Sequence, residues 1–356
     1  MELDSRKQKI LKAIIEEYTS TGEPVGSKRI TSLLDITVSP ATVRNDMAQL
    51  FDMGMLEQHH TSAGRVPSHL GYRYYLDHIL EPPELTPMEQ ARIQAMFNVA
   101  NPDPDRLLED AAQALANFTR CAALFSTSTP QTVRVSKIEL IPANERTVII
   151  MVIASNGVIK NKVCRMPFEV NAAMCQFFTN FANERLAGRS LNDIASHFAS
   201  SVSFGGEDYA AAFNSLLSAI YELCREINDG QFYSKGHTNL LHYEELKDAA
   251  GDLLLFLDKE QELRNLISEQ GGDVQVIVGK ENSRMELSES SVVITRYRIG
   301  RERCGTIGVI GPVRMDYARL IPRMQCFANL LSELLSESMS NQKKIYYSYK
   351  RRHTSA

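Results

Sequence analysis

Several features that would place this chain in a specialised class are missing from its sequence. No window of about 18 consecutive apolar residues occurs, so we expect no membrane-spanning helix. The first residues, MELDSRKQKILKAI, are charged and amphipathic and lack the apolar core of a signal peptide. The six cysteines include no C-x-x-C pair, which disfavours both structural zinc and a disulfide framework. These absences favour a protein of the reducing cytoplasm.

Catalytic signatures and an excess of positive charge are missing as well. The sequence contains no G-x-S-x-G motif, no H-E-x-x-H motif and no carboxylates paired at motif spacing, so an enzyme is the weakest functional hypothesis. The formal net charge of -4 does not by itself indicate a nucleic-acid partner. A local basic face can still bind DNA while acidic domains dilute the total. With 356 residues, of which 44% are hydrophobic, the chain is long enough for two or three domains.

Two glycine-containing stretches raise the question of phosphate or nucleotide binding. In TGEPVGSKRI (Thr21 to Ile30) the glycines are one residue too close for a P-loop, and Ser27 precedes Lys28 instead of following it. The segment before it has the apolar spacing of a helix, with Ile10, Leu11, Ile14, Ile15 and Tyr18 on one face. We therefore expect a turn between two helices, with Ser27 capping the second. The glycines of GTIGVIGPV likewise lack the G-x-G start of a dinucleotide site, so no cofactor is expected.

The first 80 residues have the pattern of a helix-turn-helix with a wing. A short helix over SKRITSLL, with Ile30, Leu33 and Leu34 inward, precedes a helix that begins with a Ser39 cap and Pro40. In this next helix Val43, Met47 and Leu50 share one face. At 100° per residue the opposite face carries Ala41, Thr42, Asn45 and Gln49, with Arg44 on its flank, and Gly54 ends the helix. Such a helix would enter a major groove.

The next segment, MLEQHHTSAGRVPSHLGYRYYLDHIL, indicates a strand, a turn and a return to a helix, which is the pattern of a wing. Arg65 and the His59–His60 pair would lie along it, where arginine can reach phosphates or a narrow minor groove. Adjacent histidines point to opposite sides of a strand, so a shared metal is not expected. From Met1 to Tyr75 nine Lys and Arg residues are balanced by nine Asp and Glu residues, so this segment has no net charge. The polar helix face could therefore simply be solvated, or the helix-turn-helix could contact a protein instead of DNA.

Beyond residue 80, the composition indicates a linker, followed by segments whose patterns are alternately typical of helices and of strands. The prolines of LEPPELTP (80–87) predict a linker, and NPDPDRLLEDAAQALANFTRCAALFS predicts a helix. Residues 133–166 predict adjacent antiparallel strands with turns at PANER and SNG, and residues 169–228 are helical. The apolar stripes of that helical part could pair with a second chain, although an internal core is their commoner explanation. Three strands from DVQVIVG onward precede a closing helix from Tyr317 to Ser338 and a basic tail that could contact DNA or be disordered.

Four strings occurring in this order resemble one family. TGEPVGSK, VSPATVRNDMAQL, HTSAGRVPSHLGYRYY and GTIGVIGPVRMDY are similar to those of the bacterial HrcA-type heat-inducible transcription repressors. The resemblance implies a multidomain α+β fold: a winged helix-turn-helix (1–80), a GAF-like domain (81–168 and 231–340) interrupted by an inserted dimerising domain (169–230), and a basic tail (341–356). It also implies a homodimer that binds an inverted-repeat operator of chaperone operons and is kept active by the chaperonin.

Together these patterns predict a DNA-binding repressor with a defined set of contact residues. Those expected to dock on or read the major groove are Ser39, Thr42, Arg44, Asn45 and Gln49. Those expected to steady the DNA backbone are Lys28, His60, Arg65 and Arg73. The alternative hypothesis is a small-molecule-responsive regulator that uses the GAF-like domain as its sensor. No metal site is expected.

Overall fold

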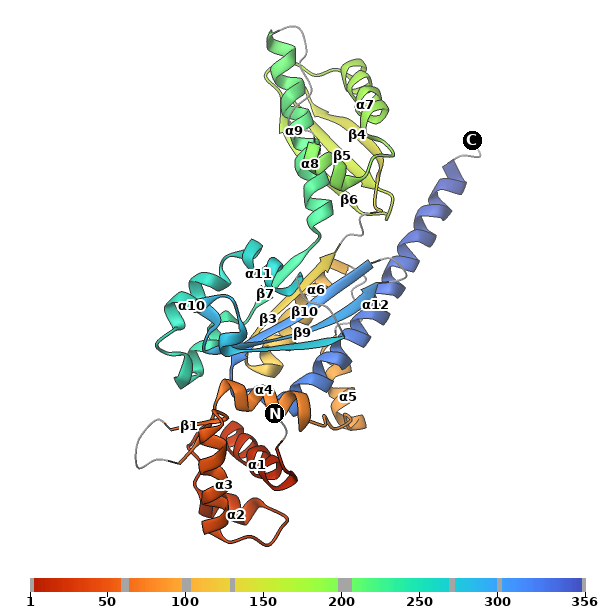
Figure 1. The fold of residues 1–356 in the computed structure, drawn as a ribbon. Coiled ribbons are helices and arrows are strands. Elements are labelled where there is room, and N and C mark those ends of the chain that lie inside the picture. The colour runs from red at the N-terminus through yellow and green to blue at the C-terminus, as the bar shows by residue number, and fades with distance from the viewer. Residues whose placement is uncertain are drawn as a thin grey trace. The chain divides into compact units, whose positions relative to one another are not determined.

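A computed structural model describes residues 3–58, 64–97, 104–128, 132–197, 207–268, 273–299 and 303–353 (Figure 1). The chain divides into two compact units. The first unit comprises Met1–Phe125, Tyr233–Tyr297 and Thr306–Leu334. The second comprises Ser126–Phe232, Arg298–Gly305 and Leu335–Ala356. No helix in the described part of the chain is long and apolar enough to cross a membrane.

The N-terminal part of the first unit is the expected set of helices with a small sheet. Its elements are α1 (Ser5–Thr21), α2 (Ser27–Leu33), α3 (Pro40–Asp52), β1 (Leu56–Glu57), β2 (Val66–Pro67) and α4 (His69–His78). Asp4 caps α1 through a hydrogen bond from the Lys7 N–H, and Gly22 ends that helix at φ 74°, a left-handed value that suits glycine. Strand β1 pairs antiparallel with β2, which confirms the hairpin.

Two details of this region were predicted wrongly. Gly26, not Ser27, is the N-cap of α2, and no side chain caps that helix. Leu33 was expected to face inward but is 42% exposed, whereas Ile30 is fully buried. A helix of seven residues has only a narrow inward face, and Ile30 is its one buried residue.

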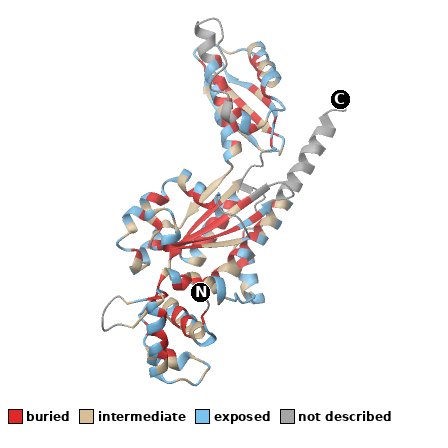
Figure 2. Ribbon diagram, in the orientation of Figure 1, coloured by how far each residue is buried: buried red, intermediate tan, exposed pale blue. Residues whose placement is uncertain are grey.

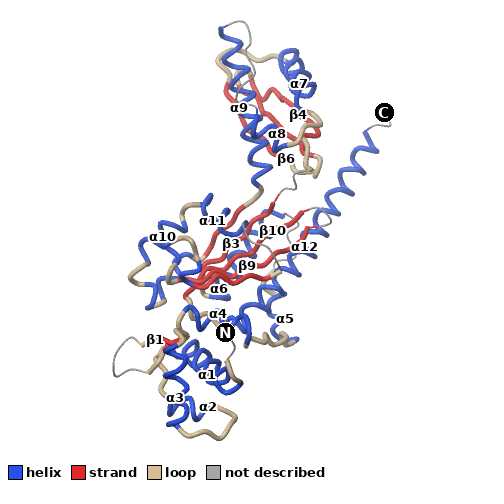
Figure 3. Tube along the Cα trace, viewed as in Figure 1, coloured by secondary structure: helices blue, strands red, loops and turns tan. Residues whose placement is uncertain are grey.

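The remainder of the first unit is built on a five-stranded sheet of order β7-β3-β10-β9-β8. Figure 3 draws its strands in red. Its strands are β3 (Ala122–Ser128), β7 (Phe232–Lys235), β8 (Val274–Val278), β9 (Ser290–Ile299) and β10 (Arg303–Pro312). Its helices are α5 (Pro87–Gln94), α6 (Pro104–Thr119), α10 (Ala250–Leu257), α11 (Glu260–Ser268) and the part of α12 (Tyr317–His353) up to Leu334. Short 3-10 turns connect them: η2 (His237–His242), η3 (Glu244–Leu246), η4 (Gly279–Glu281) and η5 (Met285–Leu287).

Two helix bounds expected in this sheet region are wrong, and the structure also shows where the glycines of GTIGVIGPV lie. The helix expected to continue through CAALFS ends at Thr119, and Arg120 adopts φ 56° before β3 begins. The closing helix continues to His353 rather than ending at Ser338, so the expected tail is largely helical. Gly308 and Gly311 lie within β10, where the side chains of Ile267, Met315 and Cys121 occupy the space beside them. These glycines permit close packing and form no phosphate loop.

The second unit has its own core. Its elements are β4 (Val135–Asn144), β5 (Thr147–Ala154), β6 (Ile159–Arg165), α7 (Ala172–Leu186), α8 (Leu191–His197) and α9 (Glu207–Asp229). The strands form an antiparallel sheet β4-β5-β6, and one sheet face shares a single hydrophobic core with the helices (Figure 2). The unit therefore includes the strands that were assigned to the GAF-like domain, and its boundary does not fall at residue 169. Strands and helices belong together because each buries its apolar face on the other.

Candidate nucleic-acid interface

Helix α3 is the centre of the candidate interface, and its own sequence determines where it begins and which way it faces. The Ser39 hydroxyl accepts a hydrogen bond from the Thr42 N–H at 3.1 Å, and Pro40 occupies the first helical position. Val43, Met47 and Leu50 are buried beneath the helix. Because these three residues anchor one face, the opposite face remains in solvent.

The outer face of α3 carries polar groups that are free to bind. Arg44, Asn45 and Gln49 are exposed, and within the described ranges no hydrogen bond or ion pair engages their side chains. Thr42 is half-buried, and its hydroxyl lies 2.9 Å from that of Ser39. The residues predicted to meet DNA on this helix therefore share one accessible surface.

One functional feature of α3 escaped the sequence analysis. Asp46 is only 2% exposed, and Arg6 of α1 donates two hydrogen bonds to its carboxylate, at 2.7 and 3.1 Å. The bidentate pair attaches α1 to α3 and satisfies a buried charge. The position of Asp46 in the sequence could have revealed this pair. Asp46 precedes Met47 on the inward side of the helix, where a carboxylate requires a cationic partner.

The base of the wing is held by backbone contacts from TGEPVGSKRI. Val25 and Arg65 form an isolated antiparallel bridge with two N–H···O bonds of 2.9 Å. Gly64 lies so close to Val25 that an added Cβ would come within 2.5 Å of the Val25 carbonyl. The guanidinium of Arg65 lies 4.9 Å from the centre of the Phe51 ring, at the end of α3. His60 was also predicted to contact DNA, but it lies outside the described residues.

Lys28 differs from its neighbour Arg29 in its electrostatic surroundings. Arg29 donates to the carboxylate of Glu17 at 2.8 and 3.1 Å. Lys28 is exposed on the first turn of α2 and has no carboxylate within 4.0 Å among the residues described. Of the two cations, Lys28 is the one available to a phosphate.

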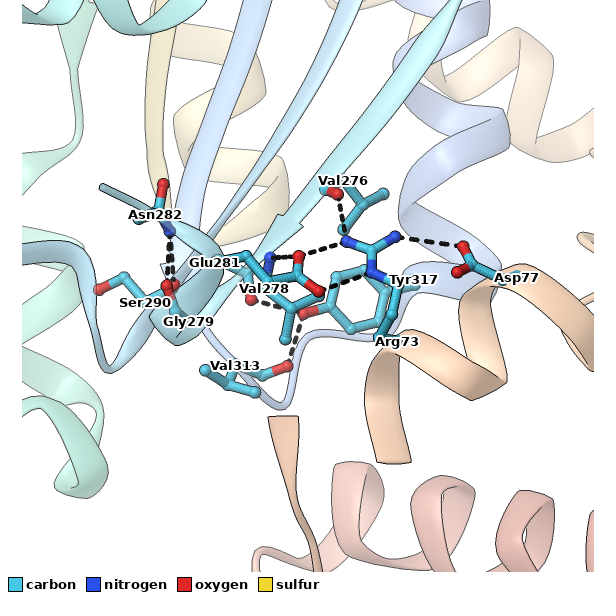
Figure 4. A network of polar contacts seen from close by, with 11 residues as sticks. Arg73, Asp77, Val276, Val278, Gly279, Glu281, Asn282, Ser290, Val313 and Tyr317 are labelled. Carbon is cyan, nitrogen blue, oxygen red and sulfur yellow. Dashed lines mark hydrogen bonds and ion pairs between the residues drawn. The ribbon is translucent and has the colours of Figure 1, made fainter. Parts of the chain in front are cut away.

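Arg73 lies in a different environment from the other predicted contacts (Figure 4). Its guanidinium donates to Glu281 Oε1 at 2.7 Å and to the Val276 carbonyl at 2.6 Å, and it pairs with Asp77 at 3.2 Å. The bond to Glu281, more than any other contact, raises the pKa of Arg73. Burial raises the pKa of Glu281, but hydrogen bonds from Arg73 and the Val278 N–H outweigh it, so its pKa lies below the ordinary value. The structure does not bring Arg73 together with the exposed face of α3.

These features define a class of protein. Three helices, an outward polar face on the third and an adjoining two-stranded wing constitute a winged-helix DNA-binding domain. A family model described as "Winged helix-turn-helix transcription repressor, HrcA DNA-binding" matches residues 2–75, and one described as "HrcA protein C terminal domain" matches residues 105–321. The chain belongs to the HrcA family of heat-inducible transcription repressors, a family of regulators and not of enzymes. This confirms the resemblance found in the sequence.

Individual relatives align with this chain over nearly its whole length. The heat-inducible transcription repressor HrcA of Halalkalibacterium halodurans is 34% identical over 94% of this chain and 98% of the relative. That of Thermoanaerobacter pseudethanolicus is 34% identical over 96% of this chain and all of the relative. A crystal structure of a hypothetical protein, 24% identical, aligns with a TM-score of 0.64 over 95% of this chain and all of that one, which shows a shared fold.

Proposed function

We propose that this repressor acts in the bacterial cytoplasm by inserting α3 into the major groove of an inverted-repeat operator upstream of chaperone genes. The observation that carries this proposal is the surface of α3: buried apolar residues lie behind, and exposed polar residues lie in front. Asn45 and Gln49 are suited to base edges, because side-chain amides can form two hydrogen bonds with adenine. Arg44, Arg65 and Lys28 are suited to phosphates, since each is an unpaired cation among the residues described.

Salt dependence of DNA binding tests this assignment. An arginine that contacts a phosphate releases a counterion, so its loss lowers the magnitude of the negative slope of log K against log salt by about 0.9 per subunit. We expect this decrease for Arg44→Ala and for Arg65→Ala on a duplex selected by the wild-type chain from random sequence. Arg29→Ala is the matched control, because Glu17 already neutralises Arg29. Unchanged affinity and slope in both Arg44→Ala and Arg65→Ala would refute the docking model.

We further propose that two chains form a homodimer through the second unit. Its β4-β5-β6 sheet has one face on the core, and the other face carries paired apolar residues. The register aligns Ile141, Ile149 and Val163 across the three strands on that outer face. Ile141 is 39% exposed and Val163 63% exposed. A twofold axis would bring this surface onto its copy, which suits an operator with two symmetric halves.

Sedimentation of the full chain tests the dimer. Val163→Asp places a charge on the outer face and should yield a monomer, whereas Val163→Thr keeps a β-branched side chain and should remain a dimer. Operator affinity should fall together with dimerisation, because two linked half-sites bind through effective concentration. A Val163→Asp chain that stays dimeric at wild-type strength would exclude this face as the interface.

The proposed regulation follows from family resemblance and from stability. A chaperonin would keep the repressor folded, and heat-unfolded proteins that occupy the chaperonin would release repression. Such a sensor works because marginal stability converts small changes in folding free energy into several-fold changes in active protein. Operator binding by the full chain should therefore rise when purified chaperonin and ATP are added. No change at any temperature would contradict this part of the proposal alone.

A further inference from the structure

The contact between Phe51 and Arg65 joins the last turn of α3 to the base of the wing. Phe51 is 40% exposed, and the Arg65 guanidinium lies over its ring. A cation within about 6 Å of a ring centre is attracted by the ring's negative face. The contact therefore orients the guanidinium without cancelling its charge.

The surroundings of Arg65 differ from those of two other stacked arginines, Arg284 and Arg323, and resemble those of Arg92 and Arg185, which are stacked on Phe118 and Phe181. Arg284 lies over Phe256 and also pairs with Glu262, and Arg323 lies over Phe118 and also pairs with Glu89. Arg65 lies over Phe51 but has no carboxylate within 4.0 Å in the part of the chain that the structure describes. Its positive charge remains available to an external anion.

The geometry of α3 places Phe51, over which Arg65 lies, on the same side of the helix as Arg44. At 100° per residue, Phe51 lies only about 20° around the helix from Arg44, two turns or about 10 Å along the axis. Phe51 and Arg44 therefore occupy one flank of α3, next to the outward face of Asn45 and Gln49. The backbone bridge to Val25 fixes the Cα of Arg65, and Phe51 fixes the far end of its side chain.

We propose that Phe51 is a positioning residue for DNA binding. Its ring holds the Arg65 guanidinium on the α3 flank that carries Arg44, so that both cations meet the DNA backbone beside the groove. This inference rests on the proposed docking of α3. Ordering a long side chain before binding removes part of the entropy cost that binding would otherwise carry.

The test combines a double-mutant cycle with salt titration on the full chain. The probes are the duplex selected by the wild-type chain and an unrelated duplex of equal length. Phe51→Ala should weaken binding to both duplexes by about 3- to 10-fold, since a backbone contact carries no sequence information. Its salt slope should stay near that of the wild type, because Arg65 keeps its charge. In the Arg65→Ala background, Phe51→Ala should have almost no effect.

Two further variants separate positioning from folding. Phe51→Tyr retains a ring and should bind as the wild type does. Phe51→Glu offers Arg65 a carboxylate, so its salt slope should fall by about 0.9 per subunit, as in Arg65→Ala. Met88→Ala, which removes an 80% exposed apolar side chain from α5, is the control for loss of exposed surface. Thermal unfolding midpoints should match across the set.

The outcomes distinguish this inference from the docking model. If Arg65→Ala lowers affinity and slope but Phe51→Ala does not change affinity, the positioning role is wrong and docking stands. Equal losses from Phe51→Ala with and without Arg65 would also overturn the positioning role. If Arg65→Ala changes neither quantity, Arg65 does not contact DNA, and both the positioning role and that part of the docking model fail.

Discussion

Replacing Arg73 should separate a structural arginine from a DNA-contacting one. Arg73 is 29% exposed and Glu281 34% exposed, so their pair lies between a surface ion pair and a buried one. Surface pairs contribute about 0–1 kcal/mol, and breaking a fully buried pair costs about 3–5 kcal/mol. With solvent screening, we expect Arg73→Ala to lower the free energy of unfolding by about 1–2 kcal/mol. In a unit of this size that corresponds to roughly 2–8 °C in Tm.

Calorimetry and operator titration together give the decisive measurement for Arg73. Arg73→Ala should lower Tm and leave the salt slope of DNA binding unchanged, because its guanidinium is already occupied by Glu281 and the Val276 carbonyl. Arg319→Ala is the control: its pair with Asp316 is 69% and 48% exposed, so little change in Tm is expected. An unchanged Tm with a slope lowered by about 0.9 per subunit would instead make Arg73 a phosphate contact.

The pH dependence of the same pair has a definite sign. The pKa of Glu281 is lower in the folded chain, so the folded state holds this proton less tightly than the unfolded chain does. The contribution of Glu281 is therefore fully present above about pH 4.3, the ordinary value for Glu, and is lost as the pH falls through the lower folded-state pKa. The Tm difference between wild type and Glu281→Gln should shrink on acidification, and a growing difference would refute the assignment.

Three further outcomes follow from the DNA-binding domain. Ser39→Ala removes the α3 cap and should cost about 1 kcal/mol of stability, measured by chemical unfolding, while an unchanged midpoint would mean that the cap is replaced by solvent. Arg6→Ala leaves the buried carboxylate of Asp46 without its cationic partner, so it should lower Tm more than Asp46→Ala does. A larger loss of Tm in Asp46→Ala would contradict this expectation. Gly64→Ala brings a Cβ against the Val25 backbone and should weaken operator binding. Gly26→Ala adds a Cβ at an open position and should not weaken it, so equal operator binding by the two variants would refute the role of the Gly64 contact.

The sequence alone determined the elements whose signals are local. The Ser39 cap, Pro40 and the buried spacing of Val43, Met47 and Leu50 define α3 wherever the rest of the chain lies. The two turns between β4, β5 and β6 were predicted for the same reason, since turn residues separate β-branched runs. Local chemistry is sufficient in these cases because its partners lie within a few residues.

Only the tertiary structure decided the features whose partners are distant in sequence. CAALFS became a strand because β7 and β10, which come more than 100 residues later in the chain, flank it, although its apolar run suits a helix equally well. Arg73 and Arg65 are both arginines in one short segment, yet Glu281 neutralises the first and Phe51 leaves the second charged. Charge and hydrogen-bonding capacity are properties of the residue, but whether they remain available depends on which groups folding brings within about 4 Å.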